Sequence, residues 1–190
     1  MKRSMSGKAL AVLVAVVLLI GCAVGGTVAW LVAKGGTIEN TFTVGNINVS
    51  LSETSRTYHI VPGVNIPKDP KAQVKANSED CYLFVKVEEK NWPTFKEQDG
   101  TTRKVDYKLA EGWIELEQEP GVYYREVNKN TANQDFPILK DNQVTVSKNL
   151  TKGELDTVST EPKLIFTVYA VQKEGVQDAT EAWKIAMGNK

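Results

Sequence analysis

Residues Cys81–Val87 read CysTyrLeuPheValLysVal, and this stretch decides the fold class. Every second position in it, starting from Cys81, is apolar, so these side chains would share one face of a β-strand. Tyr82 and Phe84 would partly cover the opposite face. Valine and the aromatic residues also favour strands over helices. The stretch therefore predicts a β-strand packed against a hydrophobic core.

Similar short runs recur along the chain and are separated by Gly, Pro, Asn and Asp. Residues Leu164–Val171 are apolar on both faces except at Thr167 and the Tyr169 hydroxyl, which predicts a central, buried strand. The other predicted strands cover residues 42–51 with a kink at 45–46, 58–61, 72–76, 105–109, 113–116, 122–127 and 144–148. Turns are expected at Pro62-Gly63 and at residues 77–80.

One helix is expected, at the C-terminal end of the chain. Asp178 can cap it, and Glu181 stands three residues later, in the capping-box position. Its apolar face would consist of Ala182, Trp183, Ala186 and Met187. Many short strands without intervening helices predict an all-β protein, a jelly-roll-like antiparallel β-sandwich with a short C-terminal helix. We expect a single domain over residues 30–190.

The N-terminal segment has the order of a secretory signal. Met1–Lys8 is basic, and Ala9–Ala33 contains no charged residue. This order predicts a hydrophobic signal helix within residues 1–29. Cleavage is expected after Ala29, because Thr27 and Ala29 place small residues at the −3 and −1 positions, and Trp30 would then become the first mature residue.

Two alternatives remain for this segment. Leu19–Cys22 can act as a lipobox, in which case Cys22 would carry the lipid. The uncharged stretch is also long enough to stay in the membrane as an anchor. All three possibilities place the domain outside the cell, and the first predicts a secreted protein of the extracellular matrix or cell surface.

Charge and cysteine content restrict the partners. The chain has 190 residues, with 23 basic and 23 acidic side chains. Without the basic N-terminus the balance is 20 against 23, a net charge of −3 that gives no reason to expect nucleic acid as a partner.

Cleavage would leave Cys81 as the single cysteine, so no intramolecular disulfide is expected. Its thiol is expected to behave as a small buried hydrophobic group.

The sequence offers no catalytic constellation. His59 is the single histidine, whereas zinc proteases need two or three nitrogen ligands and a general base. No GxSxG motif or phosphate-binding glycine loop is present. Glu88 and Glu89 are adjacent in a predicted strand and would point to opposite faces. We therefore predict no enzyme activity, no cofactor and no metal site.

Several segments together resemble a known family. Gly25–Leu31 reads GlyGlyThrValAlaTrpLeu, and Asn40–Leu51 reads AsnThrPheThrValGlyAsnIleAsnValSerLeu. The further segments are Val61–Gly63, Lys68–Pro70, Tyr82–Glu88, Val168–Gly175 and Glu181–Trp183. In this order they resemble the TasA/camelysin family of Gram-positive biofilm-matrix proteins, whose signal peptides are cut by a SipW-type signal peptidase. Residues 90–160 match the family only loosely.

The resemblance implies a secreted jelly-roll subunit that is cleaved and then polymerises into fibres. Residues 30–42 would be the donor strand that completes the sheet of the next copy, and head-to-tail pairing of this kind does not close. The donor-strand candidates are Trp30, Leu31, Val32, Ile38 and Phe42. The implied partners are copies of this chain, the SipW-type peptidase and other matrix proteins, and membrane contact is expected only through the N-terminal segment before cleavage.

Two other functions stay open. The family has been labelled a metallopeptidase family, so a camelysin-type secreted metallopeptidase is one alternative, although a single histidine is at odds with it. The other is a membrane-tethered or lipidated cell-surface binding domain. It is favoured by Leu31–Ala33, which prolongs the apolar stretch up to Lys34.

Overall fold

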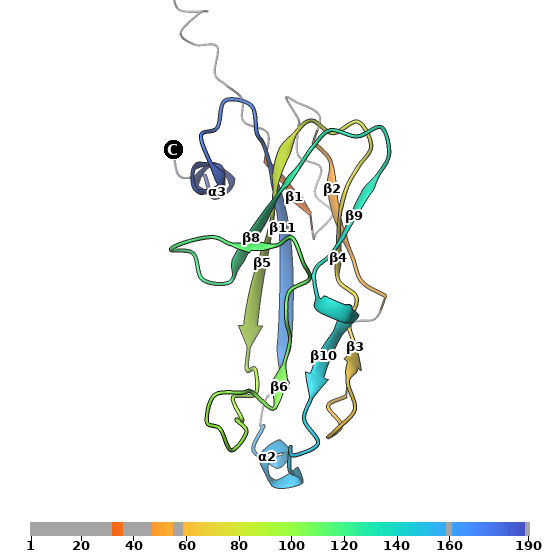
Figure 1. The fold of residues 1–190 in the computed structure, drawn as a ribbon, viewed down its shortest axis with the longest axis vertical. Coiled ribbons are helices and arrows are strands. Elements are labelled where there is room, and N and C mark those ends of the chain that lie inside the picture. The colour runs from red at the N-terminus through yellow and green to blue at the C-terminus, as the bar shows by residue number, and fades with distance from the viewer. Residues whose placement is uncertain (1–31, 36–46, 55–58, 159–160, 189–190) are drawn as a thin grey trace, which may run out of the picture.

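The computed structural model describes residues 32–35, 47–54, 59–158 and 161–188 (Figure 1). These residues form antiparallel β-sheets with a short helix at the C-terminal end. The expected all-β class and the C-terminal helix are therefore confirmed. The predicted signal helix and residues 42–46 of the strand predicted at 42–51 lie outside the described residues.

The largest sheet has five strands in the order β1-β11-β5-β8-β7. Their bounds are β1 Val32–Gly35, β11 Lys163–Gln172, β5 Cys81–Lys90, β8 Val122–Val127 and β7 Ile114–Glu115. β5 and β11 are antiparallel and pair over all ten residues of each strand, from Cys81 opposite Gln172 to Lys90 opposite Lys163. This long pair is the centre of the molecule, with further strands on both sides of it.

Two smaller sheets have three strands each, in the orders β2-β4-β9 and β3-β10-β6. The strands of the first are β2 Val49–Ser52, β4 Lys71–Val74 and β9 Gln134–Pro137. The strands of the second are β3 Ile66–Pro67, β10 Gln143–Val146 and β6 Val105–Asp106. A 3₁₀ turn, η1 Lys140–Asn142, links β9 to β10, and a short helix, α2 Lys152–Asp156, follows β10.

The main hydrophobic core lies between the five-stranded sheet and the two smaller sheets. One face of β5 supplies Cys81, Leu83 and Val85, each with no exposed surface. The smaller sheets supply Val74 and Val144, each 1% exposed. Full burial of one such aliphatic side chain stabilises the fold by about 1.5–3 kcal/mol. The alternation read from the sequence is thus the alternation that builds this core.

A second hydrophobic cluster covers the opposite face of the same sheet. Here α3, Ala179–Ala186, packs on β5 and β11, on the side away from β2, β4 and β9 (Figure 1). The Trp183 ring centroid lies 5.3 Å from that of Phe84 and 5.3 Å from that of Tyr169. Phe84 has no exposed surface. Tyr82 and Phe84 are thus buried on the second face of β5, as part of the cluster under α3, whereas Lys86 and Glu88 on the same face are only partly buried.

The start of α3 differs in one detail from a capping box. Asp178 caps the helix as predicted, because its Oδ1 accepts a hydrogen bond from the Glu181 N–H at 2.8 Å. The Glu181 carboxylate accepts a hydrogen bond from the Gln177 N–H at 2.7 Å. In a capping box, this second bond would come from the N–H of the cap residue itself, which here is Asp178. Two N–H groups at the entry of the helix are thus satisfied by carboxylates.

The turn and strand predictions have mixed outcomes. The Pro62-Gly63 turn is confirmed, since the Val64 N–H donates to Val61 O at 3.0 Å and Gly63 has φ +74°, which favours glycine. The strand predicted at 58–61 is wrong for residues 59–61, where Val61 makes only an isolated bridge to Val64. Among the described residues, this segment makes no other strand pairing.

Candidate functional site

The edge of the five-stranded sheet at β11 is the candidate assembly site. β1 lies antiparallel on β11, with Val32 opposite Val171 and Gly35 opposite Val168. In this structure one chain therefore supplies both the short edge strand and the strand that receives it. The edge strand follows the predicted cleavage site by only a few residues.

The sequence-predicted site residues are only partly placed by this geometry. Val32 is the first residue of β1 and thus lies at the edge. Thr27, Ala29 and Trp30, expected at the cleavage site, lie outside the described residues. The remaining donor-strand candidates, Leu31, Ile38 and Phe42, lie outside them too. Of the proposed donor segment 30–42, the structure describes residues 32–35.

Both faces of β11 are covered next to β1, so only its edge is open to pairing. Val168 and Ala170 have no exposed surface and belong to the main core. Tyr169, 8% exposed, and Val171, with no exposed surface, belong to the cluster under α3. A strand buried on both faces can add a partner only through its backbone hydrogen bonds. This part of β11 is an acceptor for a strand.

β11 extends beyond its edge partner β1. β1 pairs with residues 168–171, whereas residues 163–167 pair only with β5 among the described strands. The Lys68 Nζ lies 5.5 Å from the ring centroid of Phe166 in this half, and Lys68 forms an ion pair with Glu53. Phe166 belongs to the main core and Lys68 is 8% exposed, so this contact lies on a face of β11.

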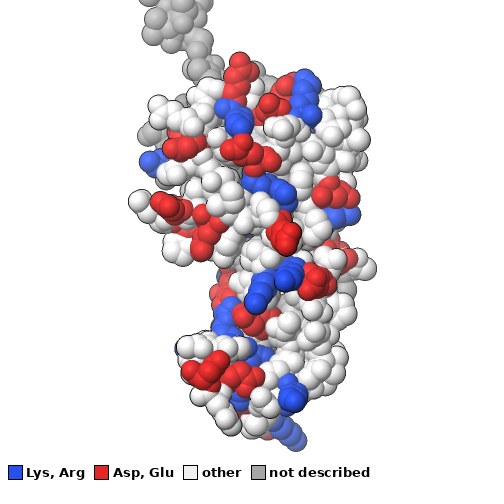
Figure 2. Space-filling model, in the orientation of Figure 1, with Lys and Arg blue, Asp and Glu red and all other residues white. Residues whose placement is uncertain are grey.

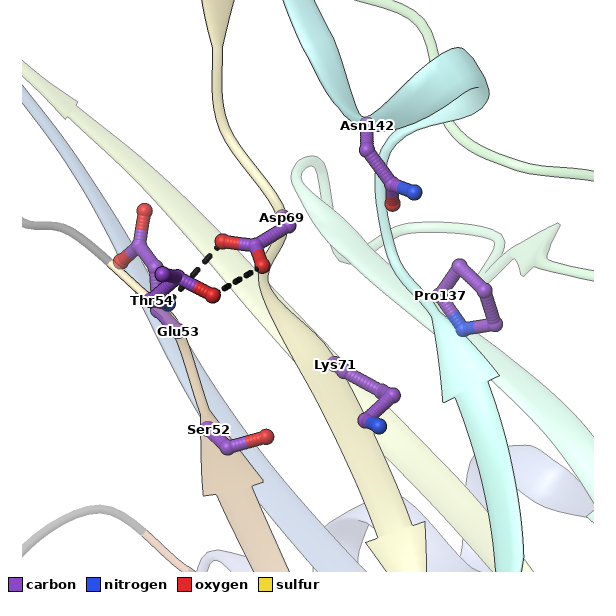
Figure 3. A pocket seen from close by; sticks show the side chains of 7 residues that line it. All are labelled: Ser52, Glu53, Thr54, Asp69, Lys71, Pro137 and Asn142. Atoms are coloured by element: carbon purple, nitrogen blue, oxygen red, sulfur yellow. Dashed lines mark hydrogen bonds between the residues drawn. The ribbon is translucent and has the colours of Figure 1, made fainter.

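A polar hollow of about 320 Å³ opens near the end of β2 (Figure 3). Its lining residues are Ser52, Glu53, Thr54, Asp69, Lys71, Pro137 and Asn142. The Asp69 carboxylate accepts from the Thr54 N–H at 3.0 Å and from the Thr54 hydroxyl. These hydrogen bonds lower the pKa of Asp69.

Each of the three charged side chains that line the hollow has a partner, and two of these partners, Asp135 and Lys68, lie outside the lining. Lys71 Nζ pairs with Asp135 at 3.0 Å, and Glu53 pairs with Lys68. Asp69 uses both carboxylate oxygens on Thr54. We therefore assign this cluster a structural role, in which it ties the end of β2 to the residues before β4. No motif in the sequence pointed to it, because its members come from four separate segments.

The residues considered for catalysis are placed as follows. Cys81 is fully buried, and burial raises the pKa of its thiol to about 12. The prediction of a small buried hydrophobic group is confirmed. His59 is exposed and lies outside the strands. Glu88 pairs with Lys86 and Glu89 with Arg103, as expected for opposite faces.

The described ranges lack two features, a metal-binding cluster and a membrane-spanning helix. Residues 32–35, 47–54, 59–158 and 161–188 contain no group of three or more His, Cys, Asp or Glu side chains arranged to hold a metal ion. Within the same ranges, no helix has both the length and the apolar character needed to cross a bilayer.

Charges of both signs are interspersed over the face of the molecule seen in Figure 2. Several form exposed ion pairs, including Lys173 with Glu126 and Lys129 with Glu79. Exposed pairs of this kind contribute about 0–1 kcal/mol each. They keep the surface soluble and mixed in sign more than they stabilise the fold.

Comparison with known proteins adds no relative. No protein-family model, no curated protein and no solved structure matches the chain.

Proposed function

We propose that this chain is a secreted structural subunit of extracellular matrix fibres, with a jelly-roll domain, that polymerises through its N-terminal strand. One observation carries the proposal. β1 lies at the edge of the sheet, directly on the strand that would accept a donor, and it follows the predicted cleavage site. The resemblance of the sequence to the TasA/camelysin family points to the same role.

The proposed assembly step is an exchange of β1 between copies. In the single chain β1 fills its own edge position, and in the fibre the β1 of a neighbour would fill it in the same register. Exchange of an identical element keeps the contacts nearly unchanged, so it is a low-cost route to association. If each subunit donates to the next one, the pairing does not close and a filament results.

Release of the N-terminus is the trigger in this proposal. Before cleavage, residues 1–29 would hold β1 close to the membrane and prevent it from reaching another copy. After cleavage by a SipW-type peptidase, β1 would be a free chain end. Association also costs translational and rotational freedom, so polymerisation should depend steeply on protein concentration.

The test uses the pairing register as a cross-linking ruler. Ala33 stands opposite Ala170, and directly opposed residues in antiparallel strands are close enough for a disulfide. Two full-length chains would be made, both with Cys22→Ala and Cys81→Ala. One would also carry Ala33→Cys and the other Ala170→Cys. They would be processed by the peptidase, mixed and mildly oxidised.

Exchange predicts disulfide-linked pairs of chains within the fibre fraction. A matched control replaces Ala33→Cys with Lys34→Cys. Successive residues of a strand alternate between the two faces of a sheet, so this variant should give few cross-links with Ala170→Cys. A single chain carrying both Ala33→Cys and Ala170→Cys should close on itself and stay monomeric after oxidation. Fibres that form without linked pairs, or processed chains that stay monomeric at high concentration, would refute the proposal.

A further inference from the structure

Arg125 on β8 lies beside two aromatic rings at the margin between the five-stranded sheet and β9. Its guanidinium carbon lies 4.3 Å from the ring centroid of Phe136 on β9. It also lies 5.3 Å from the ring centroid of Trp113, which precedes β7. The planar guanidinium thus packs against two aromatic rings, a contact that favours arginine over lysine.

The surrounding chain fixes this arrangement. The Trp113 Nε1–H donates to Pro137 O at 2.9 Å, which ties the segment before β7 to the end of β9. The neighbouring Gly112 has φ +85°, and a Cβ at this position would lie 2.6 Å from Arg125 Nη2. The backbone can therefore approach the guanidinium this closely only with glycine at position 112. Arg125 is held in place before any ligand arrives.

The guanidinium has no anionic partner within the described part of the chain. Its Nε is buried there without an acceptor, and no carboxylate among the described residues forms an ion pair with it. Burial is what lowers the pKa of this group, and no neighbouring charge opposes the effect. Arg103 shows the contrast, since the Glu89 carboxylate accepts hydrogen bonds from both of its terminal nitrogens and Asp106 also pairs with it.

We infer that Arg125, which packs against Trp113 and Phe136, is the anchor of a carboxylate-binding site. Nε is buried without an acceptor. The terminal nitrogens Nη1 and Nη2, which have no hydrogen-bond partner among the described residues, are therefore the donors left for a ligand. Two parallel N–H groups on one edge match the two oxygens of a carboxylate. The residue is half-buried, so this charge-assisted contact would form in partly desolvated surroundings, where it is stronger than in bulk water.

The carboxylate can come from a small acid or sugar acid, or from an Asp or Glu side chain of another copy of this chain. The site itself needs only one chain, so the test of this site does not depend on whether strand exchange occurs. The full chain, labelled with ¹⁵N and kept in a non-ionic detergent, allows both sources to be tested. The readouts are the Arg125 Nε–H and Trp113 Nε1–H resonances.

Sodium glucuronate is the small-molecule probe, with glucose as the neutral control and sodium chloride to hold ionic strength constant. We expect glucuronate to move both resonances in dilute protein, while glucose and chloride leave them in place. If another copy supplies the carboxylate, both resonances should move as the protein is concentrated without probe, and glucuronate should reverse the change. Either result supports the site and identifies the source.

Two variants separate recognition from general charge effects. In Arg125→Lys the charge remains but the planar fork is lost, so the glucuronate affinity read from Trp113 should fall roughly tenfold or more. Arg103→Lys is the matched control and should leave the affinity unchanged. Arg125→Gln serves if the lysine variant fails to fold. Resonances that respond to neither glucuronate nor protein concentration, or an equal response in the Arg125 variants, would overturn the inference.

Discussion

Replacement of Trp183 by alanine should be among the most damaging single changes in this protein. The indole is 4% exposed and contacts Phe84 of β5 and Tyr169 of β11. Its removal leaves a cavity under α3, and Trp→Ala changes at buried sites cost about 3–5 kcal/mol. The eight-residue helix is too short to be stable alone, so it depends on this contact.

The expected loss can be measured by urea unfolding of the full chain in detergent, followed by far-ultraviolet circular dichroism. For a domain of this size the same loss should lower the melting temperature by about 6–20 °C. Trp183→Phe should retain part of the packing and lose less. Met187→Ala, at a residue 38% exposed just after the same helix, is the control and should change stability by about 0.5 kcal/mol or less. If Trp183→Ala and Met187→Ala lose the same amount, the second hydrophobic cluster does not hold the helix.

Two further predictions concern titrating groups. The pKa of Glu154 is lowered from 4.5 to about 2, first by the hydrogen bond from Lys104 and then by that from the Thr151 N–H. The pKa of Asp99 is lowered from 3.8 to about 2, chiefly by the Thr102 hydroxyl. Because both folded-state pKa values lie below the unfolded ones, the stabilisation from these groups is present above about pH 4.5 and is lost as the pH falls towards about 2. Urea unfolding across this range should show the loss, and the double variant Glu154→Gln with Asp99→Asn should flatten the dependence of the unfolding free energy on pH. In a Cys22→Ser chain, the buried Cys81 thiol should not react with a thiol reagent at about pH 8 until the protein is unfolded, and rapid labelling of the native protein would contradict its burial.

The sequence predicted the central elements because their signals are local. Alternating apolar residues were sufficient for β5 and β8, and a run that is apolar on both faces was sufficient for β11. A cap with a spaced apolar face was sufficient for α3. Each of these segments carries its own pattern over six to ten residues, which makes the local signal strong.

The missed elements have weak or ambiguous local signals. β3 is two residues long and β9 ends in a proline, so their pairing is decided by distant strands and not by their own pattern. The helix α2 does carry a capping box, formed by Thr151 and Glu154, but no apolar run follows it. A capping motif without such a run is weak evidence for a helix.

The surroundings of Arg125 were equally out of reach. Trp113 comes before β7 and Phe136 belongs to β9, so the stack exists only after two separate sheets have packed together. A lone arginine in a strand gives no sign of its neighbours. By contrast, the proposed donor segment is what the resemblance to the TasA/camelysin family implies for the residues after the predicted signal sequence. The position of β1 at a sheet edge agrees with such a role without testing it.

The position of β11 in the chain has a consequence for how the protein folds. It lines both hydrophobic clusters, yet its residues 163–172 come after every other described strand in the chain. Its partner β5 begins at residue 81, and β1 begins at residue 32, so the decisive pairings join distant parts of the polypeptide. High contact order of this kind slows folding. A nascent chain lacks its central strand until β11 has been translated, so we expect the sheets to remain unfolded until then.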